Sequence, residues 1–400
     1  MKKIISLLLL AVMMLSCCVA CNNEEKGEDK DVLTIGLICL HDENSTYDLN
    51  FIKAMKDAQK ALGFEDSQIV YKYNIPEGTE CTDAAIDLVE NYGCDIIFAN
   101  SFGHESFLMA AAEKYPEVQF CHATGTMAHT NKDKLANFHN AFASIYEGRY
   151  LAGIAAGMKL NEMIESGKIT ADQAKMGYVG AFRYAEVKSG YTSFYLGAKS
   201  VCPTVTMDVK FTDSWYDENK EKEAALALIE ADCVLISQHA DSMGAPNACE
   251  QAGVPNVSYN GSTVASCPNT FIVSSRIDWS PYYQYVVNCV KENKEIAVDW
   301  CGGIAEGSVV LTEINDKAAA KGTKEAIDEA IKAFQAGTLH VYDTKNFTVA
   351  GETITSFVAD VDTDDNFTPD TEVVTDGILY ESKYRSAPYF TLDIDGINAE

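Results

Sequence analysis

The chain has 400 residues, of which 47% are hydrophobic and 22% are charged. This balance is too apolar for a chain that stays unfolded, and the length allows two domains of ordinary size. The 59 acidic and 31 basic residues give a formal charge of −28. A strongly negative surface repels nucleic acid and anionic lipid headgroups, so we expect neither as a partner.

The 13 cysteines fall into two groups. Three lie near the start of the chain, and the other ten are scattered, mostly within apolar runs, at positions 39, 81, 94, 121, 202, 233, 249, 267, 289 and 301. None of these ten forms a CxxC pair or a Cys/His ladder with zinc spacing. We therefore interpret them as small buried hydrophobic residues, in preference to a disulfide framework or a metal site. No metal and no cofactor are expected.

The first 31 residues have the order of an export signal and a tether. Lys2 and Lys3 precede an uncharged, mostly apolar run over 4–15, which is too short to span a bilayer as a lasting helix. We assign 1–20 to a signal peptide and 21–31 to a flexible, charged linker. The pattern resembles a bacterial lipoprotein signal, in which a cysteine after the cleavage site is lipidated. Cys21 is the predicted residue.

Two alternatives to lipidation of Cys21 remain open. Cys17 or Cys18 could carry the lipid instead, since Cys18 stands where such signals usually have Leu. Ordinary secretion with cleavage near Ala20 is the other interpretation.

Apolar runs alternate with amphipathic segments through the first third of the chain. The run 33–40 (LTIGLICL) is nearly continuous, as is typical of a parallel strand buried on both faces. The expected series is strand 33–40, helix 48–62, strand 69–73, helix 84–92, strand 94–99, helix 104–115 and strand 118–123. Such alternation predicts a doubly wound parallel sheet.

The segment 137–159 is predicted to cross from one lobe to the other. Phe138 and Phe142 fit one face of a strand, although the same region also fits helical spacing. A clearer helical stripe follows from Tyr146 to Met158. The glycines at 148, 153 and 157 each weaken an isolated helix by roughly 1 kcal/mol relative to Ala, so we expect another backbone to approach closely there.

The alternation restarts after this helix. The expected elements are strand 175–181, helix 190–200, strand 204–211, helix 219–231, strand 233–237, helix 243–253 and strand 254–259. We expect the strand 271–275 and the helix 281–293 to return to the first lobe, and the strand 308–314 to belong to the second. Lobe 1 is thus predicted as 32–145 plus about 270–300, and lobe 2 as about 146–269 plus 301–336, with several hinge crossovers.

The region 337–400 is predicted as a C-terminal extension that packs on the lobes. Segments 339–342 and 348–353 resemble strands around a turn, and 386–392 is interpreted as a final strand or a latch. The acidic run 360–370 has Asp at alternate positions, but Asp365 stands where a calcium loop of the EF-hand type needs Gly, and Thr371 where it needs Glu. We interpret it as a solvated loop.

Ligands of parallel α/β sheets bind beyond the carboxyl ends of the strands, so the loops that follow the strands supply the candidate residues. These loops combine aromatic rings with hydrogen-bonding groups, which suits a flat heteroaromatic compound or a sugar. The candidates are Asp42, Asn44, Tyr47, Phe102, Thr124, Trp215, Gln238, Asp241, Asn260 and Trp279. Alternatively, Phe102 or Trp279 belongs to the core, and Asp42, Asn44 and Asp241 cap helices.

Catalytic and metal-binding patterns are poorly represented. The chain has no GxSxG, no P-loop and no HExxH, and GYVGAF at 177–182 lacks the full glycine pattern of a dinucleotide site. Four histidines, at 41, 104, 122 and 239, follow separate strands without the spacing of a ligand set. We predict that the protein is not an enzyme.

Several of these loops resemble the basic membrane protein family, the lipoproteins similar to purine nucleoside receptor A. The resemblance covers about 33–314 and rests on SFG at 101–103, HATG at 122–125, YEGRYLAG at 146–153, SWYD at 214–217, QHADS at 238–242 and DWSPYY at 278–283. It implies a type I periplasmic-binding-protein fold, with two Rossmann-like lobes that clamp the ligand between them.

The resemblance also implies residue roles. Trp215 matches an aromatic that stacks on a purine, Tyr47 and Phe102 lie in the opposing wall, and Asp42, Gln238 and Asp241 match polar lining positions. Where this chain has Asn260, members commonly carry an acidic residue, and a Lys lies near the position of Ser275 or Arg276. Those groups are associated with ribose, so a nucleobase, another nucleoside or a different small aromatic ligand stays open.

The sequence therefore predicts a monomeric, lipid-anchored receptor on the extracytoplasmic face of the cell membrane. It would capture a purine-like solute and pass it to an ABC permease. A signalling lipoprotein with the same cleft is the first alternative, and a nucleoside hydrolase is the second.

Overall fold

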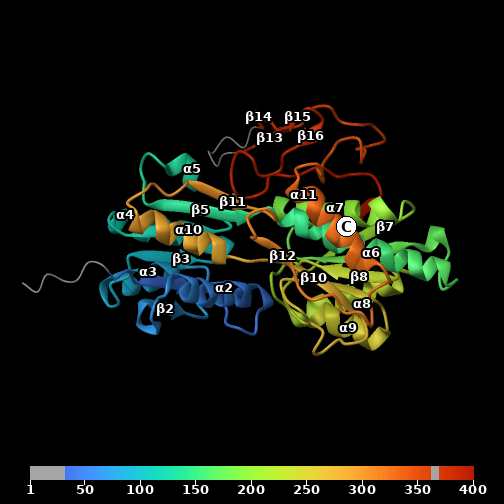
Figure 1. Ribbon diagram of the computed structural model, residues 1–400, viewed down its shortest axis with the longest axis horizontal. Coiled ribbons are helices and arrows are strands. Elements are labelled where there is room, and N and C mark those ends of the chain that lie inside the picture. The colour runs from blue at the N-terminus through green and yellow to red at the C-terminus, as the bar shows by residue number, and fades with distance from the viewer. Residues whose placement is uncertain (1–31, 362–368) are drawn as a thin grey trace, which may run out of the picture. The chain divides into compact units, whose positions relative to one another are not determined.

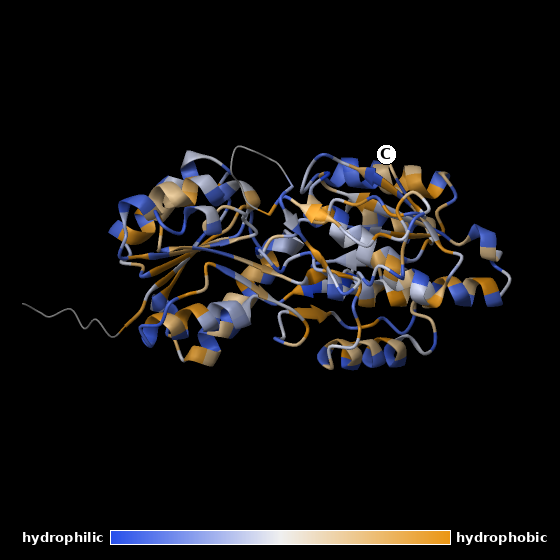
Figure 2. Ribbon diagram, turned by 90° about the horizontal axis from the view of Figure 1, so that it is seen from above, coloured by the Kyte–Doolittle hydropathy of each residue, from blue (hydrophilic) through white to orange (hydrophobic). Residues whose placement is uncertain are grey.

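A computed structural model describes residues 32–361 and 369–400 (Figure 1). The assigned signal peptide, the linker with Cys21 and most of the acidic run 360–370 lie outside these residues. Within them, the predicted α/β architecture is confirmed: one six-stranded and one seven-stranded sheet carry helices on their faces. Figure 2 shows apolar residues concentrated along the strands of both sheets.

The first sheet is parallel throughout, in the order β11-β5-β4-β3-β1-β2. Its strands are β1 (Ile35–Ile38), β2 (Ile69–Lys72), β3 (Ile96–Ala99), β4 (Gln119–Ala123), β5 (Phe138–Ala143) and β11 (Asp299–Gly302). Its helices are α2 (Thr46–Leu62), α3 (Thr79–Glu90), α4 (Glu105–Lys114), α5 (Ala128–Asn131) and α10 (Ser280–Lys291). All residues of β1, β3 and β5 are buried, because helices cover both faces of the sheet.

The two faces of this sheet have different cores. Helices α3, α4 and α5 contribute small residues such as Ala85, Ala111 and Ala128 to one core. Phe51 of α2 stacks on Trp279, which directly precedes α10, with 4.5 Å between the ring centroids. Ser45 caps α2 by accepting a hydrogen bond from the Asp48 amide, and Gly63 ends the helix in the left-handed conformation. The start of α2, which carries site residues, is therefore well defined.

The second sheet has the order β12-β10-β9-β8-β6-β7-β17, with only β12 antiparallel. Its strands are β6 (Lys175–Gly180), β7 (Thr206–Phe211), β8 (Leu235–Gln238), β9 (Asn256–Tyr259), β10 (Phe271–Ile277), β12 (Val309–Leu311) and β17 (Ile397–Ala399). The helices that follow or cover them are α6 (Ile145–Glu165), α7 (Ala185–Val201), α8 (Glu218–Glu230), α9 (Gly244–Ala252) and α11 (Thr323–Gln335).

The remaining elements are short. They are the 3-10 helices η1 (Asp66–Gln68), η2 (Phe102–His104) and η3 (Ala171–Gln173), and the two-residue strands β13 (Val358–Ala359), β14 (Thr371–Glu372), β15 (Val374–Thr375) and β16 (Ile378–Leu379). β13 pairs with β14, and β15 with β16.

The predicted crossing at 137–159 is confirmed, since β5 belongs to the first sheet and α6 packs against α7 and β10 of the second. The expected close approach also occurs. A Cβ atom on Gly153 would stand 2.1 Å from the Phe194 carbonyl oxygen, and one on Gly157 would stand 2.5 Å from the Ala198 carbonyl oxygen. Gly148 instead faces the side chains of Val309 and Ser275. Glycine at 153 and 157 therefore permits backbone contact between α6 and α7.

The expected return of the strand 271–275 to the first lobe is wrong. β10 lies in the second sheet, parallel to β9 and antiparallel to β12, and the chain crosses back only afterwards, at α10, which packs on α2. A short apolar run indicates a buried strand but carries no information about its sheet. β11 then joins the first sheet next to β5, and β12 returns to the second.

The C-terminal region differs from its prediction. Segments 339–342 and 386–392 are not strands, and 348–353 has only an isolated bridge between Val349 and Glu352. The side chain of Tyr342 instead stacks on Phe390 and hydrogen-bonds to Ser189 of α7. The aromatic and β-branched residues of the C-terminal region thus hold it in place by packing. The helix α11 and the strand β17 were not predicted.

The extension contacts both lobes. The backbone amide and the hydroxyl of Ser386 donate to Asp299 of β11, at 2.9 and 2.7 Å, while β17 extends the second sheet beside β7. The ten cysteines within the described ranges are unpaired and nine of them are buried, so their interpretation as buried hydrophobic residues is confirmed.

Glu381 of the extension is buried, and one of its carboxylate oxygens has no partner. Burial raises its pKa from 4.5 to about 8. A raised pKa in the folded state contributes stability that is present at low pH and is lost as pH rises toward about 8. We predict that the ionisation of Glu381 lowers the free energy of unfolding by about 1.4 kcal/mol for each pH unit between the ordinary pKa of 4.5 and the raised pKa of about 8.

Glu381→Gln removes this charge. Urea unfolding should give equal stabilities for the variant and the wild type at about pH 4, and a more stable variant at about pH 8, whereas the exposed control Glu352→Gln should match the wild type at both. Equal stabilities of Glu381→Gln and the wild type at about pH 8 would contradict the prediction.

Candidate functional site

The strand ends of the two sheets enclose one cavity. The space between its walls, including open solvent at its mouth, is about 450 Å³. The first lobe contributes Leu40, His41, Tyr47, Asp48, Ser101, Phe102 and Thr124, and the second contributes Glu186, Trp215, His239, Asp241 and Tyr259. These residues end a strand, follow one, or lie in the first turn of the next helix.

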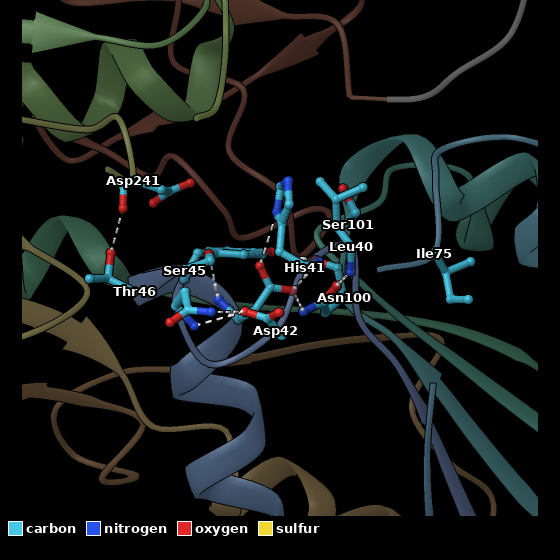
Figure 3. A network of polar contacts seen from close by, with 12 residues as sticks. Leu40, His41, Asp42, Ser45, Thr46, Ile75, Asn100, Ser101 and Asp241 are labelled. Carbon is cyan, nitrogen blue, oxygen red and sulfur yellow. Dashed lines mark hydrogen bonds and ion pairs between the residues drawn. The ribbon is translucent and has the colours of Figure 1, made fainter. Parts of the chain in front are cut away.

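Asp48, in the first turn of α2, organises the first-lobe wall, and Figure 3 labels its neighbours His41, Ser45 and Asn100. Its Oδ1 accepts hydrogen bonds from the Asn100 side chain at 2.7 Å and from the His41 amide at 3.2 Å. Its Oδ2 lies 3.4 Å from Nδ1 of His41. Burial favours the neutral acid, but the hydrogen bonds from His41, Asn100 and Ser45 outweigh it, so the pKa of Asp48 is lowered.

Asn100 links this carboxylate to the backbone. Its Oδ1 accepts from the Leu40 amide at 3.0 Å, and its carbonyl oxygen accepts from the Tyr47 hydroxyl at 2.5 Å. The loops after β1 and β3 are therefore held together by one buried amide side chain. Contact with the Asp48 carboxylate raises the pKa of His41, and burial offsets part of that rise.

Aromatic rings from both lobes meet at the cavity. Phe102 of the first lobe lies 5.6 Å from Tyr184 of the second, centroid to centroid. Tyr184 continues to Trp215 at 6.0 Å, and Phe182 packs on Trp215 edge to face at 5.0 Å. Phe102 lines the cavity and is exposed, so its ring is available to a flat ligand.

Asp241 joins the two lobes at the edge of the cavity. Its carbonyl oxygen accepts from the Thr46 hydroxyl at 3.0 Å, and its Oδ1 accepts from the Asn260 amide group at 2.8 Å. Asn260 in turn accepts from Asn50 of α2 at 3.2 Å. Burial, with the nearby Glu221 carboxylate as a second cause, raises the pKa of Asp241 well above its ordinary value.

Five of the ten predicted site residues line this cavity: Tyr47, Phe102, Thr124, Trp215 and Asp241. The other five lie elsewhere. Asp42 accepts from the amide and side chain of Asn44 in a local turn, so neither reaches the cavity wall. Gln238 is buried at the end of β8 and accepts from Asn256.

Asn260 and Trp279 also have other contacts. Asn260, at φ 63°, is bonded to Asp241 and Asn50 and so belongs to the junction between the lobes. Trp279 is buried and stacked on Phe51, which places it in the core of the first lobe, as the alternative interpretation had it.

Sequence reasoning left out several lining residues, notably His41, Asp48, Glu186, His239 and Tyr259. Asp48 and Glu186 occupy the first turn of the helix that follows a strand, a position that resembles an ordinary helix cap. The histidines do not gather: His104 bonds to the Ile75 carbonyl and His122 to the Ser101 carbonyl. Among the described residues, no group of three side chains could hold a metal ion.

Two lobes joined by several crossovers, with a cavity at facing strand ends, define a solute-binding protein. The family model of ABC transporter substrate-binding proteins of the PnrA-like type matches residues 35–345. The chain belongs to this family, which confirms the resemblance. The family binds solutes for ABC transporters, so this chain is a binding protein and not an enzyme.

Two curated relatives are 30% identical to the chain. One is a putative ABC transporter glucose-binding protein of Haloferax volcanii, matched over 66% of this chain and 64% of its own length. The other is a purine-binding protein of Brucella abortus, matched over 65% of this chain and 69% of its own length.

Among solved structures, an ABC transporter solute-binding protein of Conexibacter woesei has a TM-score of 0.61 at 18% identity, over 77% of this chain and 98% of that one. It shares the fold with this chain. Within residues 32–361 and 369–400, the helices lack the length and apolar content that crossing a membrane requires.

The pKa of His41 tests the first-lobe wall. We predict that His41 titrates above its ordinary value of 6.5 in the wild type, because the Asp48 carboxylate favours the imidazolium. In Asp48→Asn the charge is gone and burial dominates, so the pKa should fall to 6.5 or below, as followed by NMR titration.

Asp42→Asn is the matched control. Asp42 acts on His41 only through a weaker charge interaction, so the pKa of His41 should stay above 6.5 in this variant. If the pKa of His41 falls in Asp42→Asn and stays raised in Asp48→Asn, the pairing of His41 with Asp48 is wrong.

Proposed function

We propose that this protein captures a purine nucleoside or nucleobase between its two lobes and delivers it to an ABC permease in the membrane. The observation that carries the proposal is the composition of the cavity: aromatic rings from both lobes stand beside three carboxylates. Stacking on a ring suits a flat heterocycle, and carboxylate oxygens accept hydrogen bonds from ring N–H, amino and hydroxyl groups.

The charge of the cavity favours an uncharged or cationic ligand. Its lining residues include Asp48, Glu186 and Asp241 but no Lys or Arg. A phosphate group in this space would meet carboxylates of like charge, and the imidazole of His41, whose raised pKa favours a positive charge, is already paired with Asp48. Nucleotides are therefore expected to bind poorly. A nucleoside or a base carries donors for these oxygens without that repulsion.

The names of the two curated relatives point to different ligands, a purine and glucose. A sugar can stack on one ring, but it gains little from a second ring on the opposite lobe. Phe102 of the first lobe and Trp215 of the second both line the cavity, and both contact Tyr184, so the two lobes together offer ring surface that suits a planar ligand. The purine proposal rests on this arrangement.

Ligand capture is proposed to occur by lobe closure. Each lobe supplies part of the lining, so a ligand contacts both only when they are together, and it shifts the population toward that state. The hydrogen bonds from Thr46 to Asp241 and from Asn50 to Asn260 would form in the same closure.

A thermal-shift and calorimetric screen tests the proposed ligand class, since binding raises the apparent stability of the folded state. The panel contains inosine, adenosine, guanosine, adenine, AMP and glucose. We expect the nucleosides or adenine to bind, and AMP and glucose to bind at least tenfold more weakly. Preferential binding of glucose, or no binding by any purine, would overturn the proposal.

Trp215→Ala should weaken binding of the preferred purine by roughly tenfold, or about 1.4 kcal/mol, because a stacking surface is lost. Trp300→Phe is the control: Trp300 packs on Tyr282 and Tyr285, away from the cavity lining, and its loss should leave affinity unchanged. Equal affinities of Trp215→Ala and the wild type would remove Trp215 from the site.

We propose further that the mature protein is anchored by a lipid on Cys21 at the extracytoplasmic face. The signal-like segment 1–20 and the charged linker 21–31 support this assignment. Mass spectrometry of the mature N-terminus should find a diacylated Cys21, and Cys21→Ser should abolish the modification. An unmodified Cys21, or a lipid on Cys17 or Cys18, would contradict it.

A further inference from the structure

Arg149 of α6 is a buried cation without an acidic partner. Its side chain is 1% exposed, and in the described part of the chain it forms no ion pair. Its guanidinium lies 3.3 Å from the ring centroid of Tyr259, and its Nη1 donates to the Gln238 carbonyl oxygen at 2.9 Å. The Tyr259 ring thus takes the place of a carboxylate beside this charge.

The remaining contact of Arg149 determines the protonation of His239. Its Nη2 lies 3.1 Å from Nδ1 of His239, and a guanidinium can only donate hydrogen bonds. Nδ1 must therefore be the acceptor, without a proton, and a neutral ring then carries its hydrogen on Nε2. That nitrogen lies 3.4 Å from Oε1 of Glu186, which accepts.

The surroundings of His239 support the same state. Burial lowers its pKa, and the positive charge of Arg149 acts in the same direction, while Glu186 opposes both. Gly190 of α7 leaves room for the ring: a Cβ there would stand 3.1 Å from Nδ1 and 3.5 Å from the Tyr178 hydroxyl. Both His239 and Glu186 line the cavity.

We infer that Arg149 is a positioning residue that fixes His239 as the Nε2–H tautomer, so that this N–H holds the Glu186 carboxylate in place and its second oxygen accepts a hydrogen bond from the ligand. Such a carboxylate recognises a ring N–H or an amino group. The N1–H of a 6-oxopurine and the amino group of a 6-aminopurine are donors of this kind, and this ligand assignment rests on the proposed function.

Arg149 bonds to Nδ1 of His239, and Glu186 bonds to Nε2 on the other side of the ring. The arginine therefore acts on the ligand only through the imidazole, and its substitution should change the tautomer together with the affinity. A purely structural arginine would change stability and leave the tautomer in place. The imidazole nitrogens thus give a readout that separates positioning from packing.

The first experiment is an NMR spectrum of the ligand-free wild type labelled with ¹⁵N-histidine, in which long-range proton–nitrogen correlations report the tautomer of each ring. His239→Gln assigns the resonances. We expect His239 to be neutral, with a bare Nδ1 and a protonated Nε2, at about pH 7. An imidazolium, or a proton on Nδ1, would overturn the inference without any variant of Arg149.

The second experiment compares three variants by the same spectrum and by calorimetry with inosine. Arg149→Lys keeps the charge but cannot donate to Gln238 and His239 together, so we expect a mixture of tautomers and at least tenfold weaker binding. Glu186→Gln replaces an acceptor by an amide and should weaken inosine at least tenfold with the tautomer unchanged. Arg183→Lys, an exposed arginine of the same lobe paired with Asp213, is the control and should match the wild type.

The outcomes separate the two proposals. If Arg149→Lys retains both the tautomer and the affinity of the wild type, Arg149 has no positioning role. If no purine binds the wild type, the proposed ligand class fails, and the wild-type spectrum alone decides the role of Arg149. If Arg149→Lys does not fold, the wild-type tautomer and Glu186→Gln still test the placement of the Glu186 carboxylate by His239.

Discussion

The contact between the backbones of α6 and α7 is the constraint on which the cavity depends. Gly153 and Gly157 of α6 and Gly197 of α7 have no room for a Cβ, since one on Gly197 would stand 2.0 Å from the Tyr150 carbonyl oxygen. Helices that meet so closely have a fixed position relative to each other. α6 follows directly on β5 of the first sheet, so this contact also sets where the chain enters the second lobe.

The same contact places the polar groups of the second-lobe wall. Arg149 lies one turn before the glycines of α6, and Glu186 lies in the first turn of α7. His239, from the loop after β8, stands between them and is bonded to both. A shift of either helix would separate the guanidinium or the carboxylate from the imidazole. Packing in the core and hydrogen bonding at the cavity are therefore coupled through α6 and α7.

Several acidic side chains are buried in this architecture, and their burial destabilises the folded protein. Burial raises the pKa of Glu147 and Glu221 to about 7, and it also raises that of Asp241 well above its ordinary value. Glu221 offsets part of its burial by accepting the backbone amides of Ser242 and Asp217, which order the loop that carries Asp241. A buried acid whose pKa is raised in this way favours its neutral form, which can both donate a hydrogen bond to a ligand and accept one. The site thus uses groups that an empty protein would be more stable without.

The sequence was sufficient for the parts of the fold that depend on local pattern. Continuous apolar runs such as 33–40 identified the parallel strands, and the loops after them contained Tyr47, Phe102, Thr124, Trp215 and Asp241, which do line the cavity. Pattern did not tell Asp42 from Asp48, because both follow β1 and only the turn of the chain decides which one faces inward.

Contacts between distant segments could not be read from local pattern. The strand β10 joined the second sheet through its pairing with β9 and β12, and nothing in FIVSSRI specifies those partners. Arg149 and His239 are 90 residues apart in the chain, and their contact depends on the packing of α6 beside β8. The amphipathic helix α11 did have a local signal, with Ile327 and Ala330 on one buried side, which was overlooked.

A crystal structure of the protein grown with inosine tests the central claim most directly. The account predicts a purine ring beside Phe102 and Trp215, with one of its hydrogen-bond donors on Glu186 and with both lobes in contact with the ligand. A nucleoside bound to one lobe alone, or at a surface away from the facing strand ends, would contradict the account.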